Sequence, residues 1–386
     1  MTLGISFAFS IIAMMLSSIF HLRWKKTSRH HDMNFACFIT LLMLVIFMGG
    51  NVVNPDNNIY KIIYYQLDFF SKDVGFGILV FIAKKIGISL LQFRLIISIF
   101  GYLIIDLITR KYISPDYRCA FYWIYFIFPF FYDLIQIRNF LGLVFFIVSI
   151  YWISKDEIKG DVLFLIFIAL AALMQKTFLF YMPFIIIGKL LKKRMFKQLI
   201  AALGVFFIAL SANKKIVSTI ANFALSTVAD SLSGVSKFLG VSSGHGWMVL
   251  WFWTFVNLYM SYAIYIQMMS YRDKNYLLYS NEKIGFSKTI YWLNLYCIIA
   301  LPFYIMNFNF FRIERNLQVI NLIDAFMLFD IQYRNKKYVS KNKKYWLIRS
   351  SVIIITILGI WLYQSVDNLF ASTVSPAFTS NWILKY

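Results

Sequence analysis

The sequence predicts an all-α polytopic membrane protein with about twelve transmembrane helices, and three observations support this fold class. Of the 386 residues, 60% are hydrophobic and only 14% are charged. The mean hydropathy is +0.69, and a water-soluble fold could not hide that much apolar surface. One residue in five is aromatic, and aromatic side chains are favoured where a protein meets lipid and headgroups. We therefore expect one integral membrane domain over residues 1–386.

A helix needs about 20 apolar residues to cross the bilayer, and about 15 suffice where neighbouring helices help. The expected spans lie near residues 4–22, 33–50, 90–109, 118–132, 138–154, 161–174, 177–189, 198–211, 247–268, 289–307, 314–331 and 346–364. The segment 74–87 is too short and ends in Lys84 and Lys85, so we interpret it as re-entrant or interfacial.

The basic residues assign the sides of the membrane. With the N-terminus outside, the inward loops hold 23 of the 38 Lys and Arg residues. Short loops rich in Lys and Arg stay cytoplasmic, so this assignment is self-consistent. Topology and anionic headgroups then explain most of the net charge of +21, and no nucleic-acid partner is expected. These inward loops are 21–32, 110–117, 155–160, 189–197, 271–288 and 332–345.

Two outward segments are long enough to have structure of their own. Residues 54–90 are expected to form an outer-face interfacial or re-entrant segment, in which 54–73 has aromatic and apolar residues at helical spacing. Residues 212–246 mix small residues with short apolar patches and are expected to form an outer loop. The three cysteines lack the spacing of metal ligands and are expected to pack as small hydrophobes, with no metal or cofactor.

Five cations lie near the outer ends of different expected spans, where the usual charge asymmetry of membrane proteins opposes them. Ionisable groups in such places usually face a bundle interior or a cavity and often mark a functional site. Cations converging from separate helices would bind a diphosphate well, because Arg offers a bidentate fork and Lys a compact charge. The alternative is that each one reaches the headgroups or a nearby acid. These cations are Arg94, Arg138, Lys176, Arg312 and Arg315.

The acids supply the candidates for a general base. No D-x-D motif occurs, which argues against a metal-dependent nucleotide-sugar transferase with a cytoplasmic domain. Asp106 with Arg110, and Asp330 with Arg334, are four residues apart at inner helix ends and are expected to form local ion pairs. A base for glycosyl transfer would come from the outward acids. These are Asp56, Asp68, Asp73, Asp133, Asp230, Glu314 and Asp367.

One expected span carries a polar residue at every third position, from residue 312 to residue 324. Residues three apart lie on adjoining turns of one helix face, and a lipid-facing polar stripe would be very costly. The stripe must therefore face protein or water, and hydrogen bonding between helices would by itself account for it. Its members are Arg312, Arg315, Gln318, Asn321 and Asp324.

Several of these positions occur in the order typical of the EpsG-like branch of Wzy-type polysaccharide polymerases. Asp56, Tyr60 and Tyr64 match an outward Asp followed by Tyr four and eight residues later. The resemblance covers about residues 45–330. Its further elements are Asp73-Val74-Gly75-Phe76, Gln136-Ile137-Arg138-Asn139, Met174-Gln175-Lys176-Thr177 ahead of Pro183, and a late arginine that corresponds to Arg312 or Arg315.

Two departures from the family pattern concern the proposed site. The arginine that often precedes the first Asp is missing before Asp56, and the expected His is Gln175, with Lys176 beside it. Gln175 cannot carry a proton, although it can still hydrogen-bond a substrate.

The resemblance implies a metal-independent glycosyltransferase of GT-C-like membrane architecture. It would polymerise polyprenyl-diphosphate-linked oligosaccharide repeat units at the outer face of the bacterial cytoplasmic membrane. Asp56, Asp73, Arg138 and Arg312 are the implied catalytic residues. The implied partners beyond the bilayer are a flippase and a chain-length regulator. Substrate binding is expected at Tyr60, Tyr64, Arg94, Gln175, Lys176 and Arg315.

Two other functions remain open at this stage. A transporter or flippase for lipid-linked oligosaccharides would also need a cationic cavity, but the internal repeats common in transporters are not found in this sequence. A membrane acyltransferase that modifies the polymer would need a histidine-centred site within the membrane. The four histidines of this chain are badly placed for one.

Overall fold

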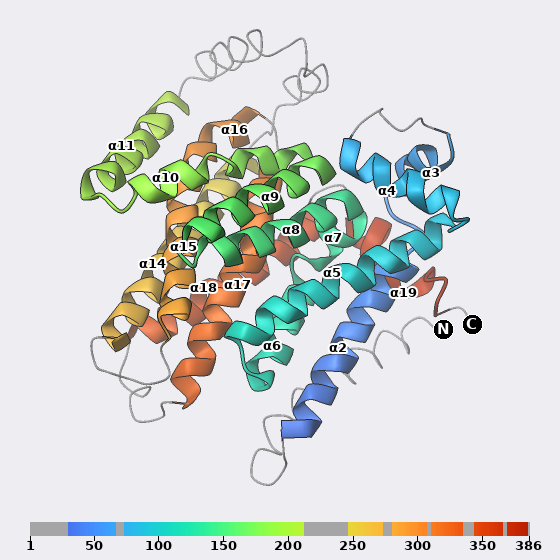
Figure 1. Cartoon of the computed structure of the whole chain (residues 1–386), viewed down its shortest axis with the longest axis horizontal. Helices are drawn as coiled ribbons and strands as arrows, with labels where there is room; N and C mark the ends of the chain where they lie inside the picture. The colour runs from blue at the N-terminus through green and yellow to red at the C-terminus, as the bar shows by residue number, and fades with distance from the viewer. Residues whose placement is uncertain are drawn as a thin grey trace.

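The computed structural model describes residues 30–66, 73–211, 246–272, 280–306, 310–334, 343–365 and 369–384, and these residues fold almost entirely into helices (Figure 1). Their only strand-like pairing is an isolated bridge between Asn51 and Asn381. The elements before residue 200 are α2 (His30–Gly50), α3 (Asn57–Tyr65), α4 (Val74–Lys85), α5 (Leu90–Tyr112), α6 (Pro115–Ile127), α7 (Phe130–Ile135), α8 (Ile137–Ile153), α9 (Ile158–Met174), η2 (Lys176–Tyr181), α10 (Phe184–Leu190) and α11 (Arg194–Ser211). The later ones are α14 (Gly246–Arg272), α15 (Asn281–Cys297), η4 (Ile298–Ala300), α16 (Leu301–Met306), α17 (Phe311–Arg334), α18 (Lys343–Ser365), the π-helical turn η7 (Phe370–Val374) and α19 (Ser375–Thr379).

Several of the described helices are suited to a membrane. Four of them are long and apolar enough to cross it, namely Leu90–Tyr112, Trp247–Ser270, Asn281–Ile305 and Trp346–Tyr363. The predicted all-helical fold with membrane spans is confirmed at this level, while the number of twelve stays a prediction. The expected span 4–22 and the expected loop 212–246, up to the start of α14, lie outside the described residues.

Two expected spans are corrected by the structure, because each is divided between two shorter helices. The expected span 118–132 breaks at Pro129, which lies between the end of α6 and the start of α7. The expected span 177–189 breaks next to Pro183, between η2 and α10. Proline has no backbone N–H and its ring clashes with the preceding turn, so it ends or kinks a helix.

Residues 54–90, which are expected at the outer face, contain a short aromatic helix. This helix is α3, whose Tyr64 is buried against Phe93 of α5 and donates its hydroxyl hydrogen to the main-chain oxygen of Ile88. The next helix, α4, has 12 residues and is therefore about 18 Å long, too short to cross a hydrocarbon core of about 30 Å. Figure 1 shows α3 and α4 together at one end of the bundle, next to the start of α5.

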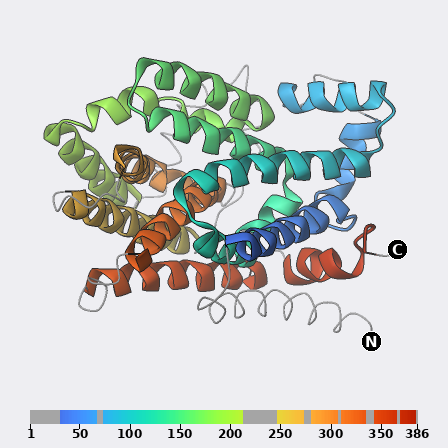
Figure 2. The same ribbon diagram turned by 60° about the horizontal axis from the view of Figure 1, so that its bottom comes forward.

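The C-terminal segment packs against the end of α2. The Trp382 N–H donates to the Gly50 carbonyl at 2.9 Å, and the Trp382 indole donates to the Gly49 carbonyl at 3.1 Å. A Cβ atom on Gly50 would lie 1.9 Å from the Asn381 side-chain oxygen, so a larger residue would displace the Asn381 side chain from this position. Figure 2 shows α18 and α19 along one side of the bundle, near α2. Residues 381–384 therefore lie at the end of α2 from which the chain continues to Asp56.

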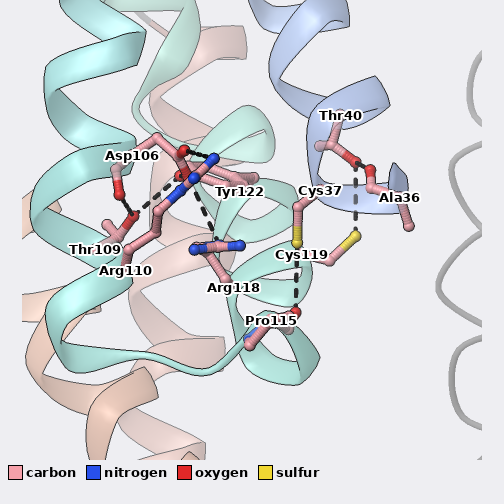
Figure 3. Close-up of polar contacts among 10 residues, drawn as sticks. All are labelled: Ala36, Cys37, Thr40, Asp106, Thr109, Arg110, Pro115, Arg118, Cys119 and Tyr122. Carbon is pink, nitrogen blue, oxygen red and sulfur yellow. Dashed lines mark hydrogen bonds and ion pairs between the residues drawn. The ribbon is translucent and has the colours of Figure 1, made fainter. Parts of the chain in front are cut away.

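A buried ionic network ties α5 to α6 at the opposite end of the bundle (Figure 3). Asp106 contacts Arg110 at 2.5 Å, as the spacing predicts, and also Arg118 at 3.6 Å. The Tyr122 hydroxyl donates to the same carboxylate at 2.7 Å. The other expected pair, Asp330 with Arg334, lies outside the described part of the chain at the Arg334 side chain. Asp330 accepts the backbone N–H of Ser114 at 2.9 Å.

The cysteines are buried and free, as the sequence predicts. Two of them lie where α2 packs on α6, and Figure 3 shows them on facing helices. The Cys37 thiol donates to the Pro115 carbonyl at 3.4 Å, and the Cys119 sulfur lies 3.5 Å from the Thr40 hydroxyl. These thiols therefore serve as packed, weakly hydrogen-bonded groups at a helix contact.

The side assignment can be tested with reporter fusions. A reporter fused after Lys193, in a loop rich in Lys and Arg, should read cytoplasmic, and one fused after Gln66, beyond α3, should read external. Alkaline phosphatase and a fluorescent protein, which are active on opposite sides of the membrane, give the two readouts. The reverse pattern would place the arginine cluster described below on the cytoplasmic side.

Candidate functional site

Three arginines from three different helices lie within electrostatic range of Asp56, the residue that precedes α3. Arg94 lies in the second turn of α5, Arg138 is the second residue of α8, and Arg312 is the second residue of α17. Each of the three interacts electrostatically with Asp56. The positive charges of Arg138 and Arg312 also repel each other. The structure thus brings together residues that are more than 250 positions apart in sequence, as expected for a shared site.

Arg138 makes the closest ion pair of this cluster. Its Nη1 atom lies 2.6 Å from Oδ2 of Asp73, the residue before α4. Its guanidinium lies 5.8 Å from the centre of the Tyr60 ring, and its backbone N–H donates to the Tyr60 hydroxyl at 3.4 Å. Burial raises the pKa of Tyr60, and the neighbouring Arg138 opposes this shift. Asp73 and Tyr60 therefore fix the direction of the Arg138 side chain.

Arg94 is almost fully buried, with 1% of its surface exposed. One terminal nitrogen donates weakly to the main-chain oxygen of Leu134, at 3.5 Å. Its Nε and Nη1 atoms have no hydrogen-bond partner within the described ranges. A buried guanidinium with free donors is costly unless an anion or water completes its contacts.

Arg315 lies next to these three arginines and is held in place by Asp133 of α7. Its Nε atom lies 3.7 Å from Oδ1 of Asp133, and both side chains are fully buried. Its Nη2 atom donates to the Gln136 side-chain oxygen at 2.9 Å. The Tyr125 hydroxyl donates to the other oxygen of Asp133 at 2.9 Å, and the Tyr132 ring centre lies 5.5 Å from the guanidinium. Asp133 thus gives Arg315 a fixed counter-charge.

The arginines together present several donors that no described side chain satisfies. These include Nε of Arg138, and Nε and Nη1 of both Arg94 and Arg315. A phosphate or diphosphate group accepts this type of donor, often two at a time. Across the described residues, no three His, Cys, Asp or Glu side chains lie close enough to hold a metal ion. The cluster therefore contains buried guanidinium donors of the kind that an anion accepts.

The other expected binding residues lie around this cluster. Gln175 ends α9 and donates to the Thr177 hydroxyl at 3.3 Å, and Lys176 is exposed at the start of η2. The same end of α9 packs on the start of α4, where a Cβ atom on Gly75 would lie 2.7 Å from the Met174 side chain. Gln175 and Lys176 thus lie on the Asp73 side of the site. The Tyr64 hydroxyl is used to hold the α4–α5 connection.

The polar stripe of α17 divides into two parts. Arg312 and Arg315 belong to the cluster, whereas the remaining three residues bond to other helices. The Trp253 indole donates to Gln318 at 3.0 Å, Asn321 and Asn294 exchange two hydrogen bonds at 2.7 and 3.1 Å, and the Ser287 hydroxyl donates to Asp324 at 3.3 Å. Hydrogen bonding between helices therefore explains the part of the stripe formed by Gln318, Asn321 and Asp324.

The paired asparagines allow a test of that structural role. Asn321→Leu leaves the buried amide of Asn294 without its partner and should lower the free energy of unfolding by about 1–2 kcal/mol. Asn294→Leu with Asn321→Leu removes both polar groups and should recover much of this loss. Thermal unfolding of the purified protein in detergent measures both, and additive losses in the double variant would contradict the pairing.

Glu314 is one of the acids expected to face outward, and its hydrogen-bond partners are neutral side chains rather than the arginines. It is fully buried and accepts hydrogen bonds from Thr254 at 2.8 Å, Asn257 at 3.1 Å and Tyr304 at 3.3 Å, which belong to α14 and α16. Sequence reasoning did not identify these three partners. It also did not pair Asp133 with Arg315, although an acid between apolar and aromatic residues is a signal for a buried charge partner.

Comparisons with known proteins place the chain in a family. The search of curated proteins and the search of solved structures each found no match. The family model of the EpsG family matches residues 34–376, which include all of the arginines and acids described above. EpsG-family proteins are polysaccharide-polymerase-like membrane proteins, in agreement with the apolar helices found here. The chain belongs to the EpsG family.

Proposed function

We propose that this protein is a membrane glycosyltransferase that polymerises oligosaccharide repeat units carried on polyprenyl diphosphate, at the outer face of the cytoplasmic membrane. The observations that carry the proposal are the 2.6 Å pair of Arg138 with Asp73 and the electrostatic interaction of Arg94, Arg138 and Arg312, from three separate helices, with Asp56. Family membership supports the same class of reaction.

In the proposed reaction, a hydroxyl of the acceptor repeat attacks the anomeric carbon of the growing chain. The bond from that carbon to the diphosphate oxygen breaks, and polyprenyl diphosphate leaves with the bonding electrons. Negative charge therefore grows on the diphosphate in the transition state. Arg138 and Arg312, held in place before the reaction, would stabilise that charge without reorganisation. Arg94, Arg315 and Lys176 would bind the same group or the sugars next to it.

The two candidate bases have different surroundings, which suggests different roles. Asp73 is paired with Arg138 at 2.6 Å, so its main effect would be to orient that guanidinium. The side chain of Asp56 does not cap α3, and its carboxylate faces the fields of three arginines. We assign Asp56 to accept the proton of the attacking hydroxyl or to orient that hydroxyl, and Asp73 to position Arg138.

Separate Asn substitutions test these two roles. Asp56→Asn should greatly shorten the polymer in cells, because an amide cannot accept the proton of the attacking hydroxyl. Asp73→Asn should shorten it less, because the amide oxygen can still accept one hydrogen bond from Arg138. Gel analysis of surface polymer, with immunoblots of membrane fractions as the control for expression, measures both. Full-length polymer in the Asp56→Asn strain would remove Asp56 as the base.

If the protein were instead a transporter, inactive variants would accumulate lipid-linked repeats in a different place. A polymerase without activity leaves single lipid-linked repeats on the outside, whereas a transporter without activity leaves them in the inner leaflet. Sugar-specific lectins applied to intact cells distinguish these cases. Repeats that become accessible only after the cells are lysed would favour the transporter.

A further inference from the structure

A crevice lies at the end of α8 opposite Arg138, between the α8–α9 connection, α10 and the middle of α15. The loops that border it carry many Lys and Arg residues, so the side assignment places it at the inner leaflet. Its charged lining residues are Lys189, Lys192, Lys288, Asp156 and Asp161.

Close backbone contacts fix the shape of this crevice. A Cβ atom on Gly285 of α15 would lie 2.7 Å from the Ser154 carbonyl, and one on Gly160 would lie 2.5 Å from the Trp152 carbonyl. Asp156 has a φ of 56°, a left-handed conformation that few residues other than glycine adopt. The α8–α9 connection is therefore packed closely against α9 and α15, beside the crevice.

Three lysine ammonium groups converge on this connection. Lys192 donates to both carboxylate oxygens of Asp156 at 2.8 Å, and Lys288 lies 3.8 Å from the same carboxylate. Lys189 pairs with Asp161. The pKa of Asp156 is lowered, mainly by the hydrogen bond from Lys192 and further by the fields of Lys288 and Lys189. Three cations against two acids leave a net positive lining, and the exposed Lys193 and Arg194 follow directly.

The other wall of the crevice is apolar. It is made by Ile153, Phe184, Ile185 and Trp292, and the Lys288 ammonium lies 4.8 Å from the centre of the Trp292 ring. Tryptophan favours the depth of the membrane interface. A lysine rim above an apolar wall matches a ligand with an anionic head and an apolar continuation. Basic pockets between helices on the cytoplasmic side bind acidic lipid headgroups in this way.

We propose that this crevice binds the phosphodiester headgroup of an anionic phospholipid of the inner leaflet, with the phosphate at the rim beside Lys192 and Lys288 and the glycerol region against Ile185 and Trp292. This site is separate from the arginine cluster, and the proposal does not depend on the reaction proposed above. The lipid would fasten α10 and α15 to the membrane surface.

Native mass spectrometry of the purified full-length protein tests the proposal with phosphatidylglycerol and phosphatidylcholine as probes. The variant Lys192→Gln with Lys288→Gln should bind phosphatidylglycerol about tenfold more weakly, since each lysine contributes appreciably to acidic-lipid affinity. Lys159→Gln with Lys193→Gln removes two charges from the same face, outside the crevice lining, and should stay within about twofold of the wild type. The melting temperature without added lipid checks that both variants are folded.

Each other result would overturn the proposal. Equal losses in the two double variants would indicate attraction by general surface charge. Equal binding of phosphatidylcholine would exclude recognition of an acidic headgroup. Displacement of the lipid by inorganic phosphate at the same concentration would assign the crevice to a soluble anion.

Discussion

Cells that carry Arg138→Ala should display single lipid-linked repeats on their surface and almost no long polymer. The guanidinium of Arg138 is oriented by Asp73 at 2.6 Å and lies beside Tyr60, so its donors are in place before substrate binds. Removing one preorganised contact to a developing charge typically lowers the rate about a hundredfold to a thousandfold. Arg138→Lys should also be damaging, because lysine keeps the charge but loses the planar fork. Gel analysis of surface polymer and lectin labelling of intact cells measure the effect.

A matched control exists at the other end of the bundle. Arg110 forms an ion pair of similar length with Asp106, at 2.5 Å, but lies in the last turn of α5, at the opposite end of that helix from Arg94. Arg110→Lys should leave polymer length unchanged. Arg312→Ala should resemble Arg138→Ala, because both arginines act on Asp56 and on each other. Normal polymer in both the Arg138→Ala and Arg312→Ala strains would remove the cationic site and leave these arginines as structural or headgroup contacts.

Much of the fold could be predicted because the bilayer imposes strong rules on sequence. The expected span 90–109 corresponds to α5, and 138–154 corresponds to α8 within one or two residues. The breaks at Pro129 and Pro183 were missed because hydropathy is averaged over a window of residues. One proline, which lacks a backbone N–H, hardly changes that average although it breaks the helix.

The sequence identified arginines that the structure brings near one another, but not which acid pairs with which arginine, and their role as a functional site stays a prediction. Arg94, Arg138 and Arg312 were identified because they lie near the expected outer ends of spans, whereas Lys and Arg are usually enriched on the cytoplasmic side. Charges in such places need a polar surrounding. Which acid faces which arginine depends on helix rotation and on contacts between segments far apart in sequence. For this reason Asp73 and Asp56 are equivalent candidates in the sequence, whereas the structure shows that Asp73 forms a 2.6 Å ion pair with Arg138.

The buried pair of Asp133 and Arg315 should be the most sensitive point of the fold. Both side chains are fully buried, so Asp133→Asn leaves the Arg315 charge without its counter-charge. Breaking a buried ion pair from one side typically costs about 3–5 kcal/mol, whereas replacing both partners by apolar residues of similar size is often neutral. We therefore expect Asp133→Asn to lower the melting temperature strongly in detergent, and Asp133→Leu with Arg315→Met to restore most of it.

The double variant also separates stability from activity. Arg315 has free donors beside the other arginines. If it binds the diphosphate, the Asp133→Leu with Arg315→Met variant should make only short polymer even though its stability is restored. Thermal unfolding and polymer length, measured on the same strains, give the two readouts. A wild-type melting temperature for Asp133→Asn would mean that Gln136 and the neighbouring rings alone accommodate the Arg315 charge. Long polymer from the double variant would instead limit Arg315 to a structural role and confine the anion site to Arg94, Arg138 and Arg312.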